Sequence, residues 1–353
     1  MKVLLIIHRQ QARGQELVAS QLGEEFLSRG MEVRVVSLYP GDFSLPFSGT
    51  ISCLNLHSSI SVWNLQKWFE FSRWVADFDP DIIQANGGDT LKFLALTSFL
   101  LPQKAKRIFN NGGVMGYYLK STFQKRLNAF FLSRMNGLVS VSDYSRSDLD
   151  KLFNPTVPHQ VIPVSIIPPD QQETDNVEFT WIHIGGFTPE KNHKGLIAIF
   201  SEAVKQGIEG NLILVGKGPL KPEIERQVDR LNLEKRVRFA GALIDPWSMI
   251  SNRSVLLLPS AIEGMPAVLG EALCLGVPSI CYTIGGVEQL LKEFPSLIGI
   301  APGQSKSFVT TMLHLQKNWD FHLGKSMQDK KRAQQFFSIS RAADDFLNFY
   351  KKL

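Results

Sequence analysis

Two carboxylates that follow an apolar segment are the residues best placed to do chemistry. Glu263 lies in the loop after the apolar run Val255–Leu258, and Glu271 follows Pro266 by five residues. Pro266 suits the first position of a helix, which would place Glu271 about 7.5 Å further along the helix axis. The backbone N–H groups of that first turn would bind an anion between the two carboxylates. This layout suits a nucleotide sugar, whose diphosphate lies between ribose and sugar hydroxyl groups.

The ordinary alternative is that both glutamates are solvated surface residues. Glu271, however, stands among Ala, Leu and Cys on an otherwise apolar helix, which favours a functional role. Gly276 and Pro278 are predicted to end that helix. A second apolar strand, Val277–Tyr282, would follow and end at Gly285-Gly286. The pattern therefore predicts a strand, a helix and a strand of a parallel sheet.

This segment resembles the donor-site signature of glycosyltransferase family 4. The resemblance rests on E-G-M-P-x-x-x-x-E, G-V-P and G-G-V-E, carried by Glu263, Gly264, Pro266, Glu271, Gly276, Pro278, Gly285, Gly286 and Glu288. Members of that family are retaining enzymes of the GT-B fold that use nucleotide-sugar donors without a metal. The resemblance thus implies an α/β chain with two Rossmann-like, doubly wound parallel-sheet domains facing across a cleft. It also implies a C-terminal helix that crosses back to the N-terminal domain.

The chain order agrees with two domains. Strands and helices alternate along the 353 residues, and prolines and polar residues dominate 155–176. We expect an N-terminal acceptor-binding domain over residues 1–168, joined by about 336–353, and a C-terminal donor-binding domain over 169–335. No G-x-G-x-x-G follows the first predicted strand, Lys2–His8, which argues against a dehydrogenase.

Composition predicts a globular protein that works in the cytoplasm. Hydrophobic residues make up 44% and charged residues 20% of the chain. The opening segment is predicted to be a buried strand rather than a signal peptide, and no run reaches the roughly 18 apolar residues of a membrane span. Cys53, Cys274 and Cys281 have no metal or redox spacing, and a reducing compartment suits them.

The resemblance implies a role for each donor-site residue. Glu263 would hold hydroxyl groups of the donor sugar, with the Gly264–Pro266 backbone near sugar and phosphate. Glu271 would accept hydrogen bonds from ribose, and Gly241–Leu243 would flank the base. The predicted donor-site residues are Gly186, Lys191, Gly216, Gly241, Leu243, Glu263, Gly264, Met265, Pro266 and Glu271.

The leaving diphosphate needs its growing negative charge stabilised. The resemblance implies no metal and no cofactor, so fixed cations and helix N-termini would serve. Lys191 lies where the family places a diphosphate-binding lysine, and it is predicted to be catalytic together with Glu263; an exposed lysine at a helix start is the alternative. Family members commonly have Arg in place of Gly186. Either Lys194 or Lys217 substitutes for that cation, or turnover is slower.

Polar turns in the first domain are predicted to bind the acceptor. Arg13 and Gly14 belong to an R-G-x-E segment that is a form seen in the family's acceptor-facing loop, although Arg13 as a simple loop cap is equally supported. Asn110 and Asn111 follow the predicted strand Arg107–Phe109. In open α/β sheets such turns at carboxyl ends line the ligand crevice.

Charge is distributed unevenly in the first domain. The chain has a net charge of +5, and 90–142 contains no Asp or Glu. The predicted amphipathic helix Tyr117–Asn136 within it resembles a surface that meets anionic lipid headgroups, although packing on its own sheet is the commoner use of an apolar stripe. The aromatic residues of Ser61–Phe78 are predicted to face the core rather than a membrane. The basic residues of the acid-free segment are Lys92, Lys104, Lys106, Arg107, Lys120, Lys125, Arg126 and Arg134.

The resemblance, together with these observations, implies a retaining glycosyltransferase of the hexosyltransferase type. It would move a sugar from a UDP- or GDP-sugar to a saccharide or lipid-linked acceptor in the synthesis of polysaccharide, lipopolysaccharide or glycolipid, in the cytoplasm or at the inner face of the plasma membrane. No nucleic-acid partner is expected. A non-catalytic nucleotide-sugar-binding partner of another transferase is the first alternative, because of Gly186. A nucleotide-sugar 2-epimerase is the second, although such enzymes typically lack E-G-M-P-x-x-x-x-E.

Overall fold

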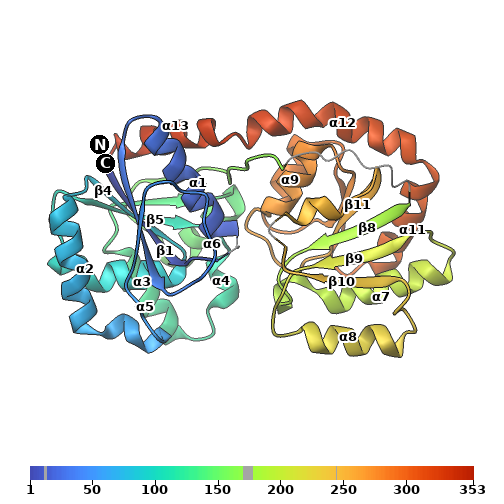
Figure 1. The fold of residues 1–353 in the computed structure, drawn as a ribbon, viewed down its shortest axis with the longest axis horizontal. Coiled ribbons are helices and arrows are strands. Elements are labelled where there is room, and N and C mark those ends of the chain that lie inside the picture. Colours follow the sequence, from blue (N-terminus) through green and yellow to red (C-terminus); the bar gives the residue numbers. More distant parts are fainter. Residues whose placement is uncertain (12–13, 170–177, 244) are drawn as a thin grey trace. The chain divides into compact units, whose positions relative to one another are not determined.

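The computed structural model describes residues 1–11, 14–169, 178–243 and 245–353 (Figure 1). The chain divides into two compact units, Met1–Ser165 with Phe337–Leu353 and Ile166–Phe336. Each unit contains one parallel β-sheet flanked by helices (Figure 1). Within the described ranges, no helix is long and apolar enough to cross a membrane.

The first unit is built on a seven-stranded parallel sheet with the strand order β3-β2-β1-β4-β5-β6-β7. Val3–Ile7 in β1 is a continuous apolar run and is fully buried, because helices cover both faces of a parallel sheet. Strand β1 pairs with both β2 and β4, so the strand order reverses at β1. In open α/β sheets, ligands bind beyond the carboxyl ends of the strands at such a point. The strands are β1 (Lys2–Arg9), β2 (Glu32–Tyr39), β3 (Thr50–Cys53), β4 (Ile82–Asn86), β5 (Lys106–Asn111), β6 (Gly137–Ser140) and β7 (His159–Val161).

Helices cover the two faces of this sheet in separate groups. One hydrophobic cluster joins the sheet to α1 and α13, and another joins it to α2, α3, α5 and α6. The helices are α1 (Gly14–Ser28), α2 (Leu65–Phe78), α3 (Gly88–Thr97), α4 (Met115–Tyr118), α5 (Thr122–Leu132), α6 (Asp143–Phe153) and α13 (Ile339–Tyr350). Short 3₁₀ turns form η1 (Ser59–Trp63) and η2 (Ser98–Leu100).

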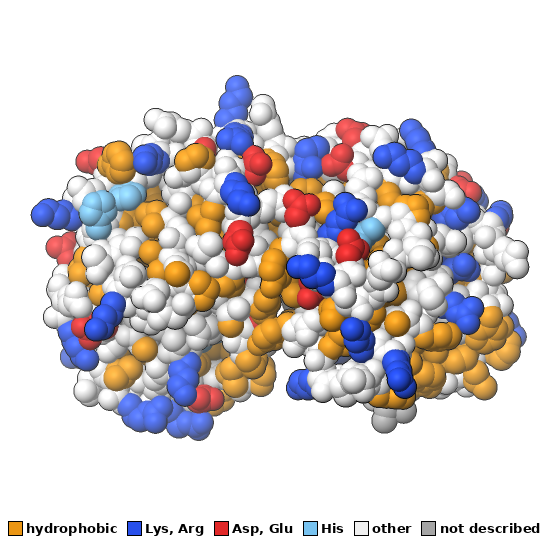
Figure 2. All heavy atoms as spheres, turned by 180° about the vertical axis from the view of Figure 1, so that it is seen from behind, with side chains coloured by type: hydrophobic (Ala, Val, Ile, Leu, Met, Phe, Trp, Pro, Cys, Tyr) orange, Lys and Arg blue, Asp and Glu red, His pale blue; other side chains and the backbone are white. Residues whose placement is uncertain are grey.

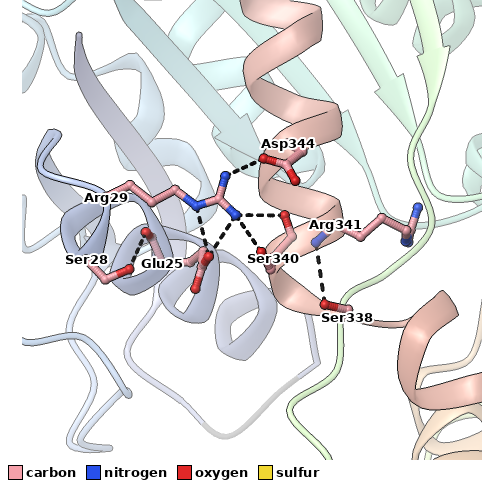
Figure 3. Close-up of polar contacts among 7 residues, drawn as sticks. All are labelled: Glu25, Ser28, Arg29, Ser338, Ser340, Arg341 and Asp344. Carbon is pink, nitrogen blue, oxygen red and sulfur yellow. Dashed lines mark hydrogen bonds and ion pairs between the residues drawn. The ribbon is translucent and has the colours of Figure 1, made fainter. Parts of the chain in front are cut away.

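The C-terminal helix α13 packs on the first unit, as predicted. Phe346, Phe349 and Tyr350 are buried in the cluster that contains α1. Figure 3 shows Arg29, just after α1, reaching across to α13. Its guanidinium group donates to Asp344 Oδ1 at 2.5 Å and to the Ser340 carbonyl at 2.9 Å. Apolar packing and these polar contacts together hold the chain terminus on the sheet.

Two predicted helices differ from the structure. The predicted helix Tyr117–Asn136 is divided into α4 and α5, and Ser121 caps α5 by accepting a hydrogen bond from Gln124 N–H at 3.2 Å. The predicted segment Ser61–Phe78 is a 3₁₀ turn followed by α2. Four of its six aromatic residues pack on the core as predicted, including Phe71, whereas Trp63 and Phe69 are exposed.

The second unit contains a six-stranded parallel sheet with the order β10-β9-β8-β11-β12-β13. Its strands are β8 (Phe179–Ile184), β9 (Asn211–Val215), β10 (Val237–Gly241), β11 (Arg253–Leu258), β12 (Ser279–Tyr282) and β13 (Ile298–Ile300). Strand order reverses at β8, which pairs with both β9 and β11. The carboxyl ends of these two central strands are therefore the expected place for a ligand.

Helices again fill the connections between the strands of this second sheet. They are η3 (Pro189–Lys191), α7 (His193–Lys205), α8 (Lys221–Arg230), η4 (Pro246–Met249), α9 (Ala267–Leu275), α10 (Val287–Glu293), α11 (Ser305–Lys317) and α12 (Trp319–Phe336). Two Rossmann-like parallel-sheet units, with the C-terminal helix on the first, constitute the predicted GT-B architecture. The cleft between the units and the functional labels of the two domains stay predictions.

Candidate functional site

Two loops at the carboxyl ends of β8 and β11 are tied together in the second unit. Ala261 N–H donates to the Glu190 carbonyl at 2.7 Å, and the Asn192 side-chain amide donates to the Pro259 carbonyl at 2.9 Å. Asn192 also caps α7, because its side-chain oxygen accepts from Gly195 N–H at 3.2 Å. Its φ of 52° lies in the left-handed region, which Asn tolerates. The two loops therefore form one polar surface at the point where the strand order of the second sheet reverses.

Lys191 and Glu263 are in contact on this polar surface. Lys191 Nζ donates to Glu263 Oε1 at 2.7 Å, although the two residues are 72 positions apart in the chain. Glu263 is 8% exposed, and its own carbonyl accepts from Gly286 N–H at 3.1 Å. Removing one partner of such an enclosed ion pair leaves the other charge without compensation. The structure thus brings together the two residues that were predicted to be catalytic.

Helix α9 begins directly after this ion pair. Pro266 was predicted to be its first residue, but Pro266 has an extended ψ of 114° and is the N-cap, so α9 starts at Ala267. Gly264, Met265 and Pro266 are buried. Proline has no side chain that can cap, and the described residues supply no side-chain hydrogen bond to this end of the helix. Its first N–H groups therefore remain available to an anion.

Glu271 is held by a residue that the sequence reasoning missed. Trp247 Nε1 donates to Glu271 Oε2 at 2.7 Å, and Trp247 is buried in η4. Burial raises the pKa of Glu271, the nearby Asp245 charge adds to this rise, and the hydrogen bond from Trp247 opposes it. The available signal was a lone Trp in the segment D-P-W-S-M, which follows the strand that precedes β11.

Close backbone contacts explain Gly216 among the predicted donor-site residues. A Cβ atom at Gly216 would lie 2.0 Å from the Gly185 carbonyl oxygen, and its φ is +148°. Gly216 N–H donates to the Gly241 carbonyl at 2.7 Å, so the ends of β8, β9 and β10 are drawn together. Gly241 has a φ of +74°, and Leu243 just beyond it is half-buried. Their predicted contact with the base stays a prediction.

Gly186 is different, because it has room for a side chain. A Cβ atom there would lie 3.5 Å from the Lys217 carbonyl oxygen, an ordinary contact. The same carbonyl accepts from Phe187 N–H at 3.1 Å, so Lys217 lies on the loop that adjoins Gly186. Both Lys217 and Lys194, the two proposed replacements for the missing cation, are exposed.

Two buried histidines lie behind the Lys191 loop and were also missed. The rings of His183 and His193 are 4.6 Å apart edge to face, and His183 Nδ1 donates to the Leu257 carbonyl at 2.8 Å. Within the described residues, His183 Nε2 and both ring nitrogens of His193 have no hydrogen-bond partner. Burial lowers the pKa of His183 to about 4 and that of His193 to about 2. Both imidazoles are therefore neutral near pH 7.

The predicted acceptor residues lie at the carboxyl edge of the first sheet, apart from Arg13, which falls outside the described residues. Asn110 and Asn111 end β5 and are buried, and within the described ranges Asn110 Oδ1 and Asn111 Nδ2 have no partner. Gln15, near the start of α1 at Gly14, donates to the Asn110 carbonyl at 3.4 Å and was missed. Polar atoms left unpaired in a buried place suit a ligand with hydroxyl groups.

A hydrogen-bond network supports this edge. Asn110 Nδ2 and Gln84 Nε2 both donate to Asn86 Oδ1, at 3.0 and 2.9 Å. Tyr350 OH on α13 donates to Gln84 Oε1 at 2.6 Å. The C-terminal helix thus positions Asn110 through two intermediates.

A second polar pair flanks the same edge. His8 Nδ1 lies 3.4 Å from Asp89 Oδ2, and Lys92 donates to the other Asp89 oxygen at 2.8 Å. The hydrogen bond with His8 is the main cause that lowers the pKa of Asp89 well below its usual range, and Lys92 contributes. Asp89 therefore carries a fixed negative charge beside the end of β1.

Ser140, His159 and Asp150 have the residue types of a nucleophilic triad but are a structural link. Ser140 Oγ lies 2.9 Å from His159 Nε2, and His159 Nδ1 lies 2.7 Å from Asp150 Oδ1. Ser140 is fully buried, and its carbonyl accepts from Ile162 N–H within the sheet. A substrate cannot reach this hydroxyl, so the chain of contacts ties β6, β7 and α6 together. In the described part of the chain, no group of three His, Cys, Asp or Glu residues is arranged to hold a metal ion.

Comparisons with curated proteins show similarity over part of the chain. The Vi polysaccharide biosynthesis protein VipC/TviE of Salmonella typhi is 26% identical over 204 residues, 56% of this chain and 35% of that protein. The UDP-Gal:alpha-D-GlcNAc-diphosphoundecaprenol alpha-1,3-galactosyltransferase of Escherichia coli is 29% identical over 181 residues, 49% of this chain and 45% of that protein. The chain thus spans less than half the length of these curated relatives.

A solved structure is similar over both units. Anabaena Alr3699/HepE in complex with UDP-glucose matches 100% of each chain with a TM-score of 0.84 and 18% identity, which establishes a common fold. Residues 168–335 match the family model described as glycosyl transferases group 1. The matched residues contain the Lys191–Glu263 pair and the start of α9.

Proposed function

We propose that this protein is a retaining glycosyltransferase that moves a sugar from a UDP-sugar to a saccharide or lipid-linked acceptor. The observation that carries the proposal is the ion pair between Lys191 and Glu263, 2.7 Å apart, beside the uncapped start of α9. A cation, a carboxylate and a helix N-terminus at one point suit a diphosphate that is linked to a polyol.

The donor would replace the contact between Lys191 and Glu263. Lys191 Nζ would leave the Glu263 carboxylate and bind a phosphate oxygen, together with the first N–H groups of α9. Glu263 would then accept hydrogen bonds from hydroxyl groups of the sugar. Glu271, oriented by Trp247, would accept from the ribose, and its oxygen Oε1 is the one not engaged by the indole.

UDP is the better supported nucleotide. The Anabaena structure is described as a complex with UDP-glucose, and the Escherichia coli relative is named for a UDP-Gal donor. A GDP-sugar, which the sequence left open, has no comparable support. Glucose and galactose derivatives are accordingly the first donors to test.

The acceptor would bind the carboxyl edge of the first sheet. Asn110 Oδ1 and Asn111 Nδ2, both buried and without a partner among the described residues, would bond acceptor hydroxyl groups, and Gln15 adjoins them. The Escherichia coli relative is named for a diphosphoundecaprenol-linked acceptor. A polyprenyl-diphosphate-linked saccharide is therefore a suitable first acceptor.

Front-face transfer without a metal is the proposed mechanism. The bond between the anomeric carbon and the diphosphate oxygen breaks while the acceptor hydroxyl attacks from the same face. The departing oxygen takes the acceptor's proton, so no protein nucleophile is required. Lys191 and the α9 N-terminus stabilise the charge that develops on the diphosphate.

Nucleotide binding tests the donor site. Thermal melting would be measured with UDP, GDP, UDP-glucose and UDP-galactose in the presence of EDTA, because a ligand that binds only the folded state raises the melting temperature. We expect a shift with UDP that is lost in Glu271→Ala. Glu223→Ala, on the exposed side of α8, is the matched control and should respond like the wild type. The absence of a shift with every nucleotide would refute the proposal.

Gly186 keeps one alternative open, a non-catalytic partner of another transferase. UDP release from UDP-glucose or UDP-galactose, with and without an acceptor mixture, separates the two. Nucleotide binding without UDP release under any condition would favour the non-catalytic protein.

A further inference from the structure

Large apolar side chains gather on the outer side of the first unit. Phe69 on α2 and Phe99 in η2 are 53% and 69% exposed, and Trp63 at the end of η1 and Leu65 at the start of α2 are exposed as well. The Phe99 ring packs edge-on against Trp68 at 5.9 Å, so η2 adjoins α2. Figure 2 shows hydrophobic side chains grouped at the lower right, with Lys and Arg side chains at their border. Isolated exposed hydrophobic residues need no explanation, whereas a patch does.

Helix α5 adds a second apolar group, for which the sequence left contact with lipid headgroups and packing on the sheet both open. Its buried residues are Phe131 and Leu132, while Phe123 is 72% exposed and Phe130 is exposed too. Phe123 and Phe130 are seven residues apart and so lie on the same face of the helix. The guanidinium of Arg134 lies 4.9 Å from the Phe130 ring centroid. This helix therefore presents aromatic and basic groups together to solvent.

Basic residues outnumber acidic residues in α2, α3 and α5 taken together. Lys120, Lys125 and Arg126 are exposed, and none forms an ion pair with an acidic residue in the described part of the chain. The acid-free segment 90–142 supplies α5, η2 and most of α3. The two acids of α2 both have basic partners: Lys67 Nζ lies 2.8 Å from Glu70, and an Arg34 nitrogen lies 3.3 Å from Asp77. A partner of negative charge is what this surface complements.

Helix α3 joins the apolar and basic groups. It packs against η1, η2 and α5, and nearly all its residues from Thr90 to Thr97 are buried. The elements that carry the exposed aromatic side chains and those that carry the lysines thus cover the same helix on one face of the sheet. We call their outer surface the amphipathic face; it consists of Trp63, Leu65, Phe69, Phe99, Phe123 and Phe130 with Lys120, Lys125 and Arg126.

We propose that the amphipathic face docks on a bilayer that contains anionic lipid. The aromatic and leucine side chains would enter the boundary between headgroups and acyl chains, and the basic side chains would pair with lipid phosphates. A second copy of this chain is a poorer occupant, because a two-fold contact would place the basic groups of α5 close to their own equivalents. The proposal is independent of the proposed transfer reaction, since binding to lipid can be measured without donor or acceptor.

Co-flotation with vesicles tests it. The whole chain would be mixed with vesicles of phosphatidylcholine alone or with added phosphatidylglycerol. We expect flotation only with the anionic lipid and a decrease at high salt, because surface charges are screened. Lys125→Glu with Arg126→Glu should weaken binding by more than an order of magnitude, since each basic group near the surface contributes roughly a fivefold factor.

The apolar part is tested separately. Phe69→Ser with Phe99→Ser should reduce flotation at least tenfold, while the circular dichroism spectrum stays unchanged, because both side chains are exposed. Phe321→Ser and the pair Lys306→Glu with Lys331→Glu, exposed residues of the second unit, are matched controls and should float like the wild type. Equal loss in the controls would overturn the assignment of the surface.

Sedimentation tests the alternative that a second copy of this chain covers the amphipathic face. If Phe69→Ser with Phe99→Ser converts a dimer to a monomer and leaves vesicle binding intact, the face is an interface between copies and the proposal is wrong. Failure of the wild type to float with anionic vesicles, while UDP still raises its melting temperature, would refute the bilayer proposal and leave the proposed function standing.

Discussion

Lys191 Nζ and Glu263 Oε1 are 2.7 Å apart, and they join the loop after β8 to the loop after β11. Each side chain compensates the charge of the other, and each has a separate proposed partner on the donor. The pair is therefore a point where stability and function depend on the same contact.

Replacing Lys191 should destabilise the protein, and a second change should restore part of the loss. Lys191→Met leaves the Glu263 carboxylate enclosed without its cation, and we expect a loss of about 2 kcal/mol in the free energy of unfolding, below the value for a fully buried pair because Lys191 is 22% exposed. Adding Glu263→Gln should recover at least half of that loss. Urea unfolding of the single and double variants measures the coupling, and strictly additive effects would show that the two side chains do not interact.

Glu271 should be unfavourable for stability and necessary for nucleotide binding. Because its pKa is raised in the folded state, the folded protein holds this proton more tightly than the unfolded chain, so stability falls as pH rises through the interval above the ordinary glutamate pKa. Glu271→Gln should therefore raise the melting temperature at pH 7 and weaken UDP binding. Calorimetric titration and thermal melting at pH 5 and pH 7 check both parts; a variant that binds UDP normally would exclude a ribose contact.

Gly186 offers a gain-of-function test. A Cβ atom fits at this position, and a guanidinium group there would add charged hydrogen bonds to the diphosphate. Gly186→Arg should tighten UDP binding by roughly tenfold, a typical value for a hydrogen bond to a charged group. Gly186→Ala is the control for the backbone and should bind as the wild type does. If Arg leaves both UDP affinity and turnover unchanged, the site does not lack a cation.

The buried histidines should make the protein sensitive to mild acid. Both pKa values lie below the ordinary 6.5, so above that pH neither state carries the extra proton and the histidines do not affect stability. As pH falls below 6.5, the unfolded chain binds protons that the folded protein excludes, and each histidine costs about 1.4 kcal/mol per pH unit until its folded pKa is reached. His193→Phe, stacked on Phe187, should lose less melting temperature between pH 7 and pH 5 than the wild type. An equal loss would place the acid sensitivity elsewhere.

Ser140 should matter for stability only. Ser140→Ala removes a buried hydroxyl that bonds His159, and we expect a loss of about 1–2 kcal/mol because the imidazole nitrogen is left without a partner. Donor turnover per folded molecule should not change. Urea unfolding measures the first effect and UDP release the second; loss of turnover in a fully folded sample would contradict a structural role.

The sequence alone determined the architecture and most residues of the proposed donor site. Hydrophobic periodicity is a local pattern, so the strands and helices could be read from the sequence, and their alternation predicts parallel sheets. The spacing of Glu263, Glu271 and Gly276 likewise places a helix between two strands. The chain order of strands and the position of Lys191 one loop after β8 were equally readable.

Only the tertiary structure decided which distant side chains meet. The Lys191–Glu263 contact depends on β8 and β11 being neighbours, which no local pattern encodes. Trp247 and Gln15 were missed for the same reason, since each acts through a partner from another element. Phe69 falls in a sequence pattern that was predicted to face the core, and Phe123 in one for which core packing was the commoner expectation, yet both are exposed. Helical spacing shows that residues share a face, but whether that face meets the sheet or solvent depends on how the neighbouring elements pack.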